Sequence, residues 1–329
     1  MTVFKVDSHY QQATARWAGV VPPIPTDAPS LRRINDATMD AVMSEFTIPS
    51  KDTASETVLH YTSADGTTIP LHRFTPPSHK SSTTPGSTTP TPAILYIFGG
   101  GLVSGSVALF RKDISRYAAA TGLPIFAPAY RLAPEAAFPK PVEDVYAALE
   151  WLRDHAAEQG IDAGRIAVMG ISAGGGLAAA AALVARDRGF EPGIARLVLV
   201  YPMLDDRTRI SEDDPLHGYL TWTARKNEIG WGAYLGSDAG STEGGKMLAY
   251  AAAARATDLS GMPKTYIDVG ELDLFRDECL AFGARLAAAG IDVESHLYPG
   301  VPHGWEWAAA DAPVTKKAVE NRIRALLNM

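Results

Sequence analysis

The sequence predicts an α/β protein built on a mostly parallel sheet. From about residue 93 onwards, short apolar runs alternate with longer runs of helical spacing, as in strands joined by crossover helices. A second observation is Gly170-Ile-Ser-Ala-Gly174, which lies between an apolar run and an Ala-rich run. A serine placed between a strand and a helix in this pattern is typical of a strained turn that exposes its hydroxyl.

The individual elements follow from periodicity and turn signals. Two early runs flank Ala64-Asp65-Gly66, which indicates a hairpin. The later runs are apolar and bounded by Gly, Pro and polar residues. The predicted strands cover residues 56–60, 67–74, 93–98, 124–129, 165–169, 195–201, 264–269 and 293–298. The predicted helices of this part cover residues 110–120, 142–158, 173–188, 275–289 and 314–327.

Two segments lie outside the alternation. Residues 1–46 carry two expected helices around a proline-rich break at 21–25, with Ser30 as the expected N-cap of the second. Residues 203–258 interrupt the alternation after a core strand, which is a natural place for a lid or cap.

Composition limits the partners and the compartment. The net charge of -7 and the absence of a basic run argue against nucleic acid or an anionic membrane as partner. Cys279 is the only cysteine, which excludes an intrachain disulfide and fits a reducing compartment. No signal peptide or membrane-spanning run is recognisable, so we expect a cytoplasmic protein. The Ser/Thr/Pro-rich segment 75–92 is expected to be a surface loop.

Three residues have the types, order and positions that serine hydrolysis requires. A serine nucleophile needs a base to take its proton and a carboxylate to orient that base. Ser172 lies in the predicted turn, while Asp273 and His303 follow the last two predicted strands. Glu271 and Asp277 compete for the acid role, but Asp277 is better explained as a first-turn acid that complements a helix dipole. We predict Ser172, Asp273 and His303 as the catalytic triad.

A glycine run predicts where negative charge is stabilised. Phe98-Gly-Gly-Gly101 follows the first long strand, so its backbone N–H groups are expected to face Ser172. Each such donor contributes ~3 kcal/mol to stabilising a tetrahedral intermediate. A phosphate loop is the alternative, but the run matches neither G-x-x-x-x-G-K-[ST] nor G-x-G-x-x-G. We predict an oxyanion hole formed by Gly100, Gly101 and Ala173.

With these motifs the chain resembles the hormone-sensitive-lipase-like esterases of the α/β-hydrolase fold. The resemblance runs from about residue 93 to the C-terminus and rests on segments 99–106, 130–135 and 170–175. Segment 273–278 and the His303 loop complete it. It implies a mostly parallel central sheet flanked by helices, with a helical cap. The two segments outside the alternation resemble the two parts of this family's cap, so we expect residues 47–329 to form the catalytic domain, with 1–46 and the insertion 203–258 as the cap.

Two positions depart from the family pattern. The histidine that usually precedes the three glycines is Phe98 here, and the acid or threonine that often precedes the nucleophile is Ile171. In the family this histidine helps to hold the glycine loop, so Phe98 would keep the N–H donors and remove a polar anchor. Neither change removes a triad member. They bear on substrate preference and on the rigidity of the loop.

The expected activity is that of a serine carboxylesterase acting through an acyl-enzyme, with no metal or cofactor. A lactonase or amide hydrolase acting on a natural product or xenobiotic would use the same triad, so the sequence leaves these alternatives open. A ligand receptor on the same fold is a further alternative. Such receptors lose the catalytic histidine, which His303 supplies here.

The resemblance also implies the substrate class and the assembly. Short- to medium-chain acyl esters of small molecules are the expected substrates, and the cap is expected to select among them. A homodimer is expected to form through the last strand, near residues 291–298. The side chains expected to line the substrate pocket are Phe98, Leu102, Trp222 and Trp305.

Overall fold

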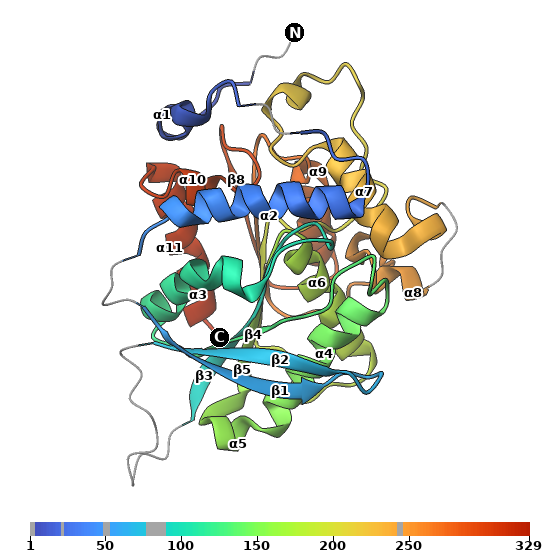
Figure 1. Cartoon of the computed structure of the whole chain (residues 1–329). Coiled ribbons are helices and arrows are strands. Elements are labelled where there is room, and N and C mark those ends of the chain that lie inside the picture. The colour runs from blue at the N-terminus through green and yellow to red at the C-terminus, as the bar shows by residue number, and fades with distance from the viewer. Residues whose placement is uncertain (1–3, 21–22, 49–52, 77–89, 242–245) are drawn as a thin grey trace.

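An eight-stranded sheet forms the centre of the protein (Figure 1). The computed structural model describes residues 4–20, 23–48, 53–76, 90–241 and 246–329. The strand order is β1-β2-β4-β3-β5-β6-β7-β8, in which β2 runs antiparallel to both of its neighbours and the other pairs are parallel. The strands are β1 Ser55–Thr62, β2 Thr68–Thr75, β3 Thr91–Ile97, β4 Ile125–Pro128, β5 Ile161–Ile171, β6 Arg196–Val200, β7 Thr265–Gly270 and β8 Val293–Tyr298.

Every predicted strand is present, and the prediction of a mostly parallel sheet is confirmed. The strands β3, β6 and β7 are buried along nearly their whole length, as is β5 from Ile166 onwards, because helices cover both faces of the sheet. The predicted loop at 75–92 lies mostly outside the described residues, and its last two residues belong to β3.

The helices form layers on the sheet. Figure 1 shows α3 and α11 near each other, and these two helices pack together, while α4 and α6 form a second packed pair. The helix predicted at 142–158 divides into α4 and α5 at His155. The ring of His155 stacks on Trp151, and its Nδ1 lies 2.9 Å from the Trp151 carbonyl oxygen. The main helices are α3 Val107–Thr121, α4 Lys140–Asp154, α5 Ala156–Gln159, α6 Ala173–Asp187, α9 Arg276–Ala288, α10 Trp305–Ala308 and α11 Pro313–Leu327.

The remaining helices come from the two segments that predict a cap. The N-terminal segment contributes α1 Ser8–Thr14 and α2 Ala28–Glu45, and Figure 1 shows α2 running across the molecule above α3. The insertion contributes α7 Ala224–Leu235 and α8 Lys246–Ala249. Helices α2 and α7 pack against each other, so the two segments meet although they are far apart in the sequence.

The prediction of Ser30 as the N-cap of α2 is wrong. The cap is Asp27, whose carboxylate accepts a hydrogen bond from the backbone N–H of Ser30 at 2.8 Å. The Ser30 hydroxyl accepts in return from the backbone N–H of Asp27 at 3.1 Å. This capping box places Ser30 at the third helical position, so the helix begins three residues earlier than the hydrophobic spacing indicated.

The segment 130–135 has an architectural role at the end of β4. The Tyr130 hydroxyl donates to the carbonyl oxygen of Phe98 at 2.8 Å, directly before the glycine run. The Arg131 guanidinium binds the buried carboxylate of Asp144 at 2.7 Å. It also binds the exposed carboxylate of Asp65 at 2.7 Å. These contacts tie the β1–β2 hairpin and α4 to the region around the glycine loop.

A charged cluster lies fully buried between the sheet and α11. The Arg322 guanidinium contacts Asp268 at 2.6 Å and Glu306 at 2.6 Å, and all three side chains are inaccessible to solvent. The hydroxyl of Tyr266 donates to Asp268, and that of Tyr201 donates to Glu306. Buried charges are tolerated only when paired and hydrogen-bonded, so one cation here compensates two carboxylates.

Replacing Arg322 with Met is therefore expected to lower the free energy of unfolding by about 3–5 kcal/mol, because it leaves two buried carboxylates unpaired. Arg324→Met is the matched control on the same helix, since Arg324 is 48% exposed and pairs with Glu294 at the surface. That change is expected to cost at most about 1 kcal/mol. Urea unfolding of both variants measures the difference, and equal losses would contradict the account.

Candidate active site

The predicted nucleophile lies in a tight turn between β5 and α6. Ser172 has φ 57° and ψ −122°, a backbone conformation that residues other than glycine rarely adopt. A Cβ atom on Gly174 would lie 2.2 Å from the Ile97 carbonyl oxygen, and one on Gly170 would lie 2.2 Å from the Gly174 carbonyl oxygen. The two glycines of the pentapeptide are thus required by close backbone packing.

The three residues of the predicted triad meet in one hydrogen-bonded chain. The Ser172 Oγ lies 2.8 Å from His303 Nε2, and His303 Nδ1 lies 2.7 Å from Asp273 Oδ2. Asp273 is fully buried, and its other oxygen accepts the backbone N–H of Phe275 at 2.9 Å. A buried carboxylate on Nδ1 orients the imidazole so that Nε2 faces the serine hydroxyl.

The competing acids have other partners. The Glu271 carboxylate accepts the backbone N–H of Gly300 at 2.9 Å and thereby holds the loop that precedes His303. Asp277 lies exposed in the first turn of α9 and pairs with Arg276 at 2.7 Å. Neither side chain makes a hydrogen bond to His303 among the residues that the structure describes.

The glycine run lies directly against the turn that carries Ser172. A Cβ atom on Gly99 would lie 3.1 Å from the Cβ of Ser172. Gly100 and Gly101 have φ 138° and 61°, and within the described part of the chain neither N–H donates a hydrogen bond. Ala173 is the first residue of α6, where a backbone N–H has no acceptor within the helix. Backbone N–H groups that make no hydrogen bond within the described residues therefore lie beside the predicted nucleophile.

Two of the predicted pocket residues pack among other aromatic side chains. Phe98 is 2% exposed and stacks on Tyr130 with ring centroids 4.2 Å apart. Trp305 is fully buried between Tyr201 and Tyr298, with 5.7 Å between ring centroids in each case. Contact of these two rings with substrate stays a prediction.

The other two predicted pocket residues lie at the glycine loop. The Trp222 ring covers Gly101, since a Cβ on that glycine would lie 2.1 Å from the indole. Leu102 follows with φ 69° and is 3% exposed. The neighbouring Thr221 donates to the carbonyl oxygen of His303 at 2.7 Å. The insertion 203–258 thus contacts both the glycine loop and the loop of the predicted base.

Tyr201 is a site residue that the sequence analysis missed. Its ring meets the His303 imidazole edge to face, with centroids 4.5 Å apart, and its hydroxyl donates to Glu306 at 2.8 Å. Among the described residues, three that are not glycine have positive φ, and they are Leu102, Ser172 and Tyr201. All three lie at this site, where strained backbone conformations commonly gather.

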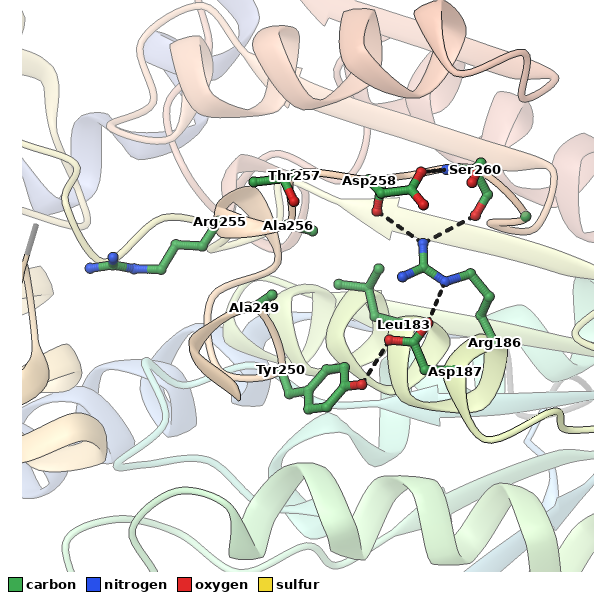
Figure 2. Close-up of a pocket in the computed structure, with 11 residues that line it drawn as sticks. Leu183, Arg186, Asp187, Ala249, Tyr250, Arg255, Ala256, Thr257, Asp258 and Ser260 are labelled. Atoms are coloured by element: carbon green, nitrogen blue, oxygen red, sulfur yellow. Dashed lines mark hydrogen bonds and ion pairs between the residues drawn. The ribbon is translucent and has the colours of Figure 1, made fainter. Parts of the chain in front are cut away.

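A cavity of about 760 Å³ lies far from the triad (Figure 2). It is bordered by Leu183 and Arg186 at the C-terminal end of α6, whereas Ser172 precedes the N-terminus of that helix. A helix of 15 residues spans about 22 Å. Arg186 is bound there to the carbonyl oxygens of Asp258 and Ser260, as Figure 2 shows. The cavity is therefore separate from the hydrogen-bonded triad.

Two features of the described residues bear on the expected partners. In the described ranges, no group of three or more His, Cys, Asp or Glu side chains is arranged to hold a metal ion. Within the same ranges, no helix combines the length and the apolar character needed to cross a membrane.

Comparison with known proteins identifies the family. A family model described as the alpha/beta hydrolase fold matches residues 94–307. The chain belongs to the hormone-sensitive-lipase-like esterases of the α/β-hydrolase fold. The family predicted from the glycine run and the nucleophile pentapeptide is thus confirmed.

Several members of this family are similar over most of the chain. Esterase LipI of Mycobacterium tuberculosis is 34% identical over 239 residues, which cover 71% of this chain and 72% of that protein. Carboxylesterase NlhH of the same species is 31% identical and covers 80% and 79%. Ethyl acetate hydrolase of Pseudomonas putida is 30% identical and covers 74% of each chain. The solved structure of a bacterial heroin esterase has a TM-score of 0.85 at 34% identity, covering 98% of this chain and 97% of that one.

One acid near the site has an unusual environment. Glu278 of α9 is half-buried, and its carboxylate accepts the backbone N–H groups of Leu204 and Asp205 and the hydroxyl of Thr208. Burial of the carboxyl raises the pKa of Glu278 to about 8. These bonds join α9 to the start of the cap insertion.

This raised pKa predicts a pH dependence of stability. The folded state keeps the Glu278 proton up to about pH 8, whereas the unfolded chain loses it near 4.5. The stabilisation is therefore complete below pH 4.5 and is lost as the pH rises towards 8. Glu278→Gln removes the titration, so between pH 5 and 8 the unfolding free energy of the wild type should fall relative to this variant by roughly 3–4 kcal/mol.

Denaturant unfolding at a series of pH values measures this difference. The matched control is Glu320→Gln, because Glu320 has a 70% exposed side chain. Its difference from the wild type should stay constant with pH. A constant difference for Glu278→Gln as well would show that its carboxyl titrates normally.

Proposed function

We propose that the protein is a serine carboxylesterase that hydrolyses short- to medium-chain acyl esters through an acyl-enzyme. The main observation in support of this reaction is the hydrogen-bonded chain from Ser172 through His303 to Asp273. It lies next to the N–H groups of the glycine loop that donate no hydrogen bond within the described residues. The match to family members that are named esterases supports the same reaction.

The first half of the proposed reaction forms the covalent intermediate. His303 Nε2 takes the proton of Ser172 as Oγ attacks the ester carbonyl carbon, and the carbonyl oxygen becomes an oxyanion. The N–H groups of Gly100, Gly101 and Ala173 stabilise this charge. The C–O bond to the alcohol then breaks, and the protonated His303 gives its proton to the leaving oxygen.

The second half restores the enzyme. Water takes the place of the alcohol and loses a proton to His303 as it attacks the acyl carbon. The tetrahedral intermediate uses the same three donors, and its collapse returns the proton to Ser172 Oγ with release of the carboxylic acid. Asp273 stays ionised throughout and stabilises the imidazolium that forms twice per turnover.

The surroundings of the glycine loop support small substrates. Trp222 and Leu102 are both nearly buried and crowd the region beside Gly101. The similarity to a protein named ethyl acetate hydrolase points to short acyl chains as well. We propose that Trp222 and Leu102 line the acyl pocket and limit its length, with the cap formed by residues 1–46 and 203–258 around it.

We further propose that the protein is cytoplasmic and that it forms a homodimer through β8. The strand lies at the edge of the sheet, where its outer backbone groups are open to pairing. Its residue Leu297 is 44% exposed, which leaves an apolar side chain on that edge.

Ser172→Ala tests the nucleophile. The variant is expected to lose at least about 10⁴-fold in kcat on p-nitrophenyl acetate, since removal of a triad member leaves only residual catalysis. Ser44→Ala, at an exposed serine of α2, is the control and should keep wild-type activity. Turnover retained by Ser172→Ala would exclude the proposed mechanism. Parallel assays on lactones and aryl amides show whether esters are the preferred class.

Trp222→Ala tests the acyl pocket. Removing the indole from the glycine loop is expected to raise kcat/KM for longer esters relative to the acetate ester by roughly 10-fold, because one or two methylenes in an apolar pocket contribute about that much. A series of p-nitrophenyl esters from acetate to decanoate measures the profile. Trp151→Ala, far from the site on α4, is the control. An unchanged chain-length profile would remove Trp222 from the pocket.

A further inference from the structure

The orientation of one predicted oxyanion donor is set by the carbonyl group that precedes it. The Gly100 carbonyl oxygen accepts three hydrogen bonds, from the backbone N–H of Val103 at 3.3 Å, the N–H of Ser104 at 3.0 Å and the Ser104 hydroxyl at 2.6 Å. The peptide between Gly100 and Gly101 is planar and trans, so its C=O and N–H point in opposite directions. Fixing this carbonyl therefore fixes where the Gly101 N–H points.

The Ser104 hydroxyl must give its proton to Gly100. A carbonyl oxygen only accepts, so the 2.6 Å contact between Ser104 Oγ and Gly100 O requires the hydroxyl proton between them. Ser104 Oγ can then only accept from its other neighbour, which is the side-chain amide of Asn35. Asn35 Nδ2 lies 2.7 Å from Ser104 Oγ, in the geometry for that donation. Ser104 is fully buried, so water does not compete for these bonds.

Asn35 belongs to a face of α2 that binds the same loop at two further points. Arg32 Nε donates to the carbonyl oxygen of Val103 at 2.5 Å. The carboxylate of Asp36 accepts the backbone N–H of Gly105 at 2.8 Å. Positions 32, 35 and 36 share one side of a helix, so α2 holds three consecutive loop residues from one face.

The position of α2 is fixed by further contacts on either side of Asn35. Arg32 also donates to the carbonyl oxygen of Ala133 at 2.8 Å and pairs with Glu135 at 2.6 Å. Lys112 of α3 donates to the carbonyl oxygen of Met43 at 2.7 Å near the helix C-terminus. Because the helix is held in this way, the Asn35 amide is held opposite Ser104.

We propose that Asn35 is a positioning residue for the oxyanion hole. It donates to Ser104, which directs the serine proton to Gly100, and the fixed peptide aims the Gly101 N–H at the developing oxyanion. This inference rests on the proposed ester hydrolysis at Ser172. It assigns to the N-terminal segment a part in transition-state stabilisation in addition to covering the site.

Asn35→Asp is the sharpest test because it preserves the shape of the side chain and reverses the hydrogen bond. An ionised Asp accepts and cannot donate, so the Ser104 proton turns towards residue 35 and leaves Gly100 O without it. Loss of a whole oxyanion donor lowers kcat by about 10²–10³, so misdirection of one is expected to lower it roughly 10- to 100-fold. KM should stay within about twofold, because the ground-state carbonyl depends little on this donor.

A second readout separates positioning from a general structural role. A trifluoromethyl ketone binds serine hydrolases as a tetrahedral oxyanion, so its inhibition constant should weaken by the same factor as kcat. The inhibition constant of the alcohol product, which has no carbonyl oxygen for these donors to bind, should not change. Asn35→Ala removes the donor without offering the Ser104 proton a new acceptor, so it should show the same pattern with a smaller loss. Ser104→Ala lacks the hydroxyl itself and should weaken kcat and ketone binding as Asn35→Asp does.

Ala37→Asp is the matched control, since it adds the same charge to an exposed position of α2. It should leave kcat and both inhibition constants at their wild-type values. Wild-type values of kcat and ketone affinity in Asn35→Asp and Asn35→Ala would overturn the inference, as would equal weakening of ketone and product binding. An inactive wild type would instead overturn the proposed function on which the inference rests.

Discussion

The site depends on the close approach of two backbone turns. The turn after β5 carries Ser172, and the loop after β3 carries the free N–H groups beside it. A Cβ on Gly99 would lie 2.8 Å from the Ile171 carbonyl oxygen, and one on Gly174 would lie 2.3 Å from that of Phe98. Side chains at these positions would force the turns apart, so the glycines of both motifs serve one contact.

The rest of the structure maintains this contact from several directions. The parallel strands β3 and β5 are neighbours in the sheet, which brings the two turns to the same edge. The cap insertion places Trp222 on Gly101 and Thr221 on the loop of His303. The N-terminal helix α2 binds the far side of the glycine loop. Phe98 stands where the family usually has a polar anchor for that loop, and the polar contacts with the loop come here from α2.

The sequence was sufficient to predict the sheet and the meeting of Ser172, Asp273 and His303 at one edge of it, while their catalytic roles stay a prediction. Apolar runs of strand length and their alternation with helices depend on local composition, and all eight strands lie where this pattern put them. Ser172, Asp273 and His303 follow strands whose ends meet at one edge, so chain order alone brought them together. Ser30 was misjudged because both Asp27 and Ser30 can cap a helix, and only the backbone conformation decides between them.

Contacts between distant elements could not be predicted in this way. Aromatic residues near a triad suit either a pocket or a core, so the sequence did not show that Phe98 and Trp305 pack among other aromatic rings. Tyr201 and Asn35 carry no local signal. Asn35 lies 69 residues before Ser104 in the sequence, on an amphipathic helix. Only the folded structure shows that its amide binds the Ser104 hydroxyl.

The central claim is that Ser172 carries the acyl group during turnover. Rapid quenching of the wild type with a p-nitrophenyl ester, followed by digestion and mass spectrometry, tests it most directly. The account predicts that the peptide containing Ser172 gains the mass of the acyl group and loses it as substrate is exhausted. Steady ester turnover with no acylation of Ser172, under conditions that trap the intermediate in a known serine esterase, would contradict it.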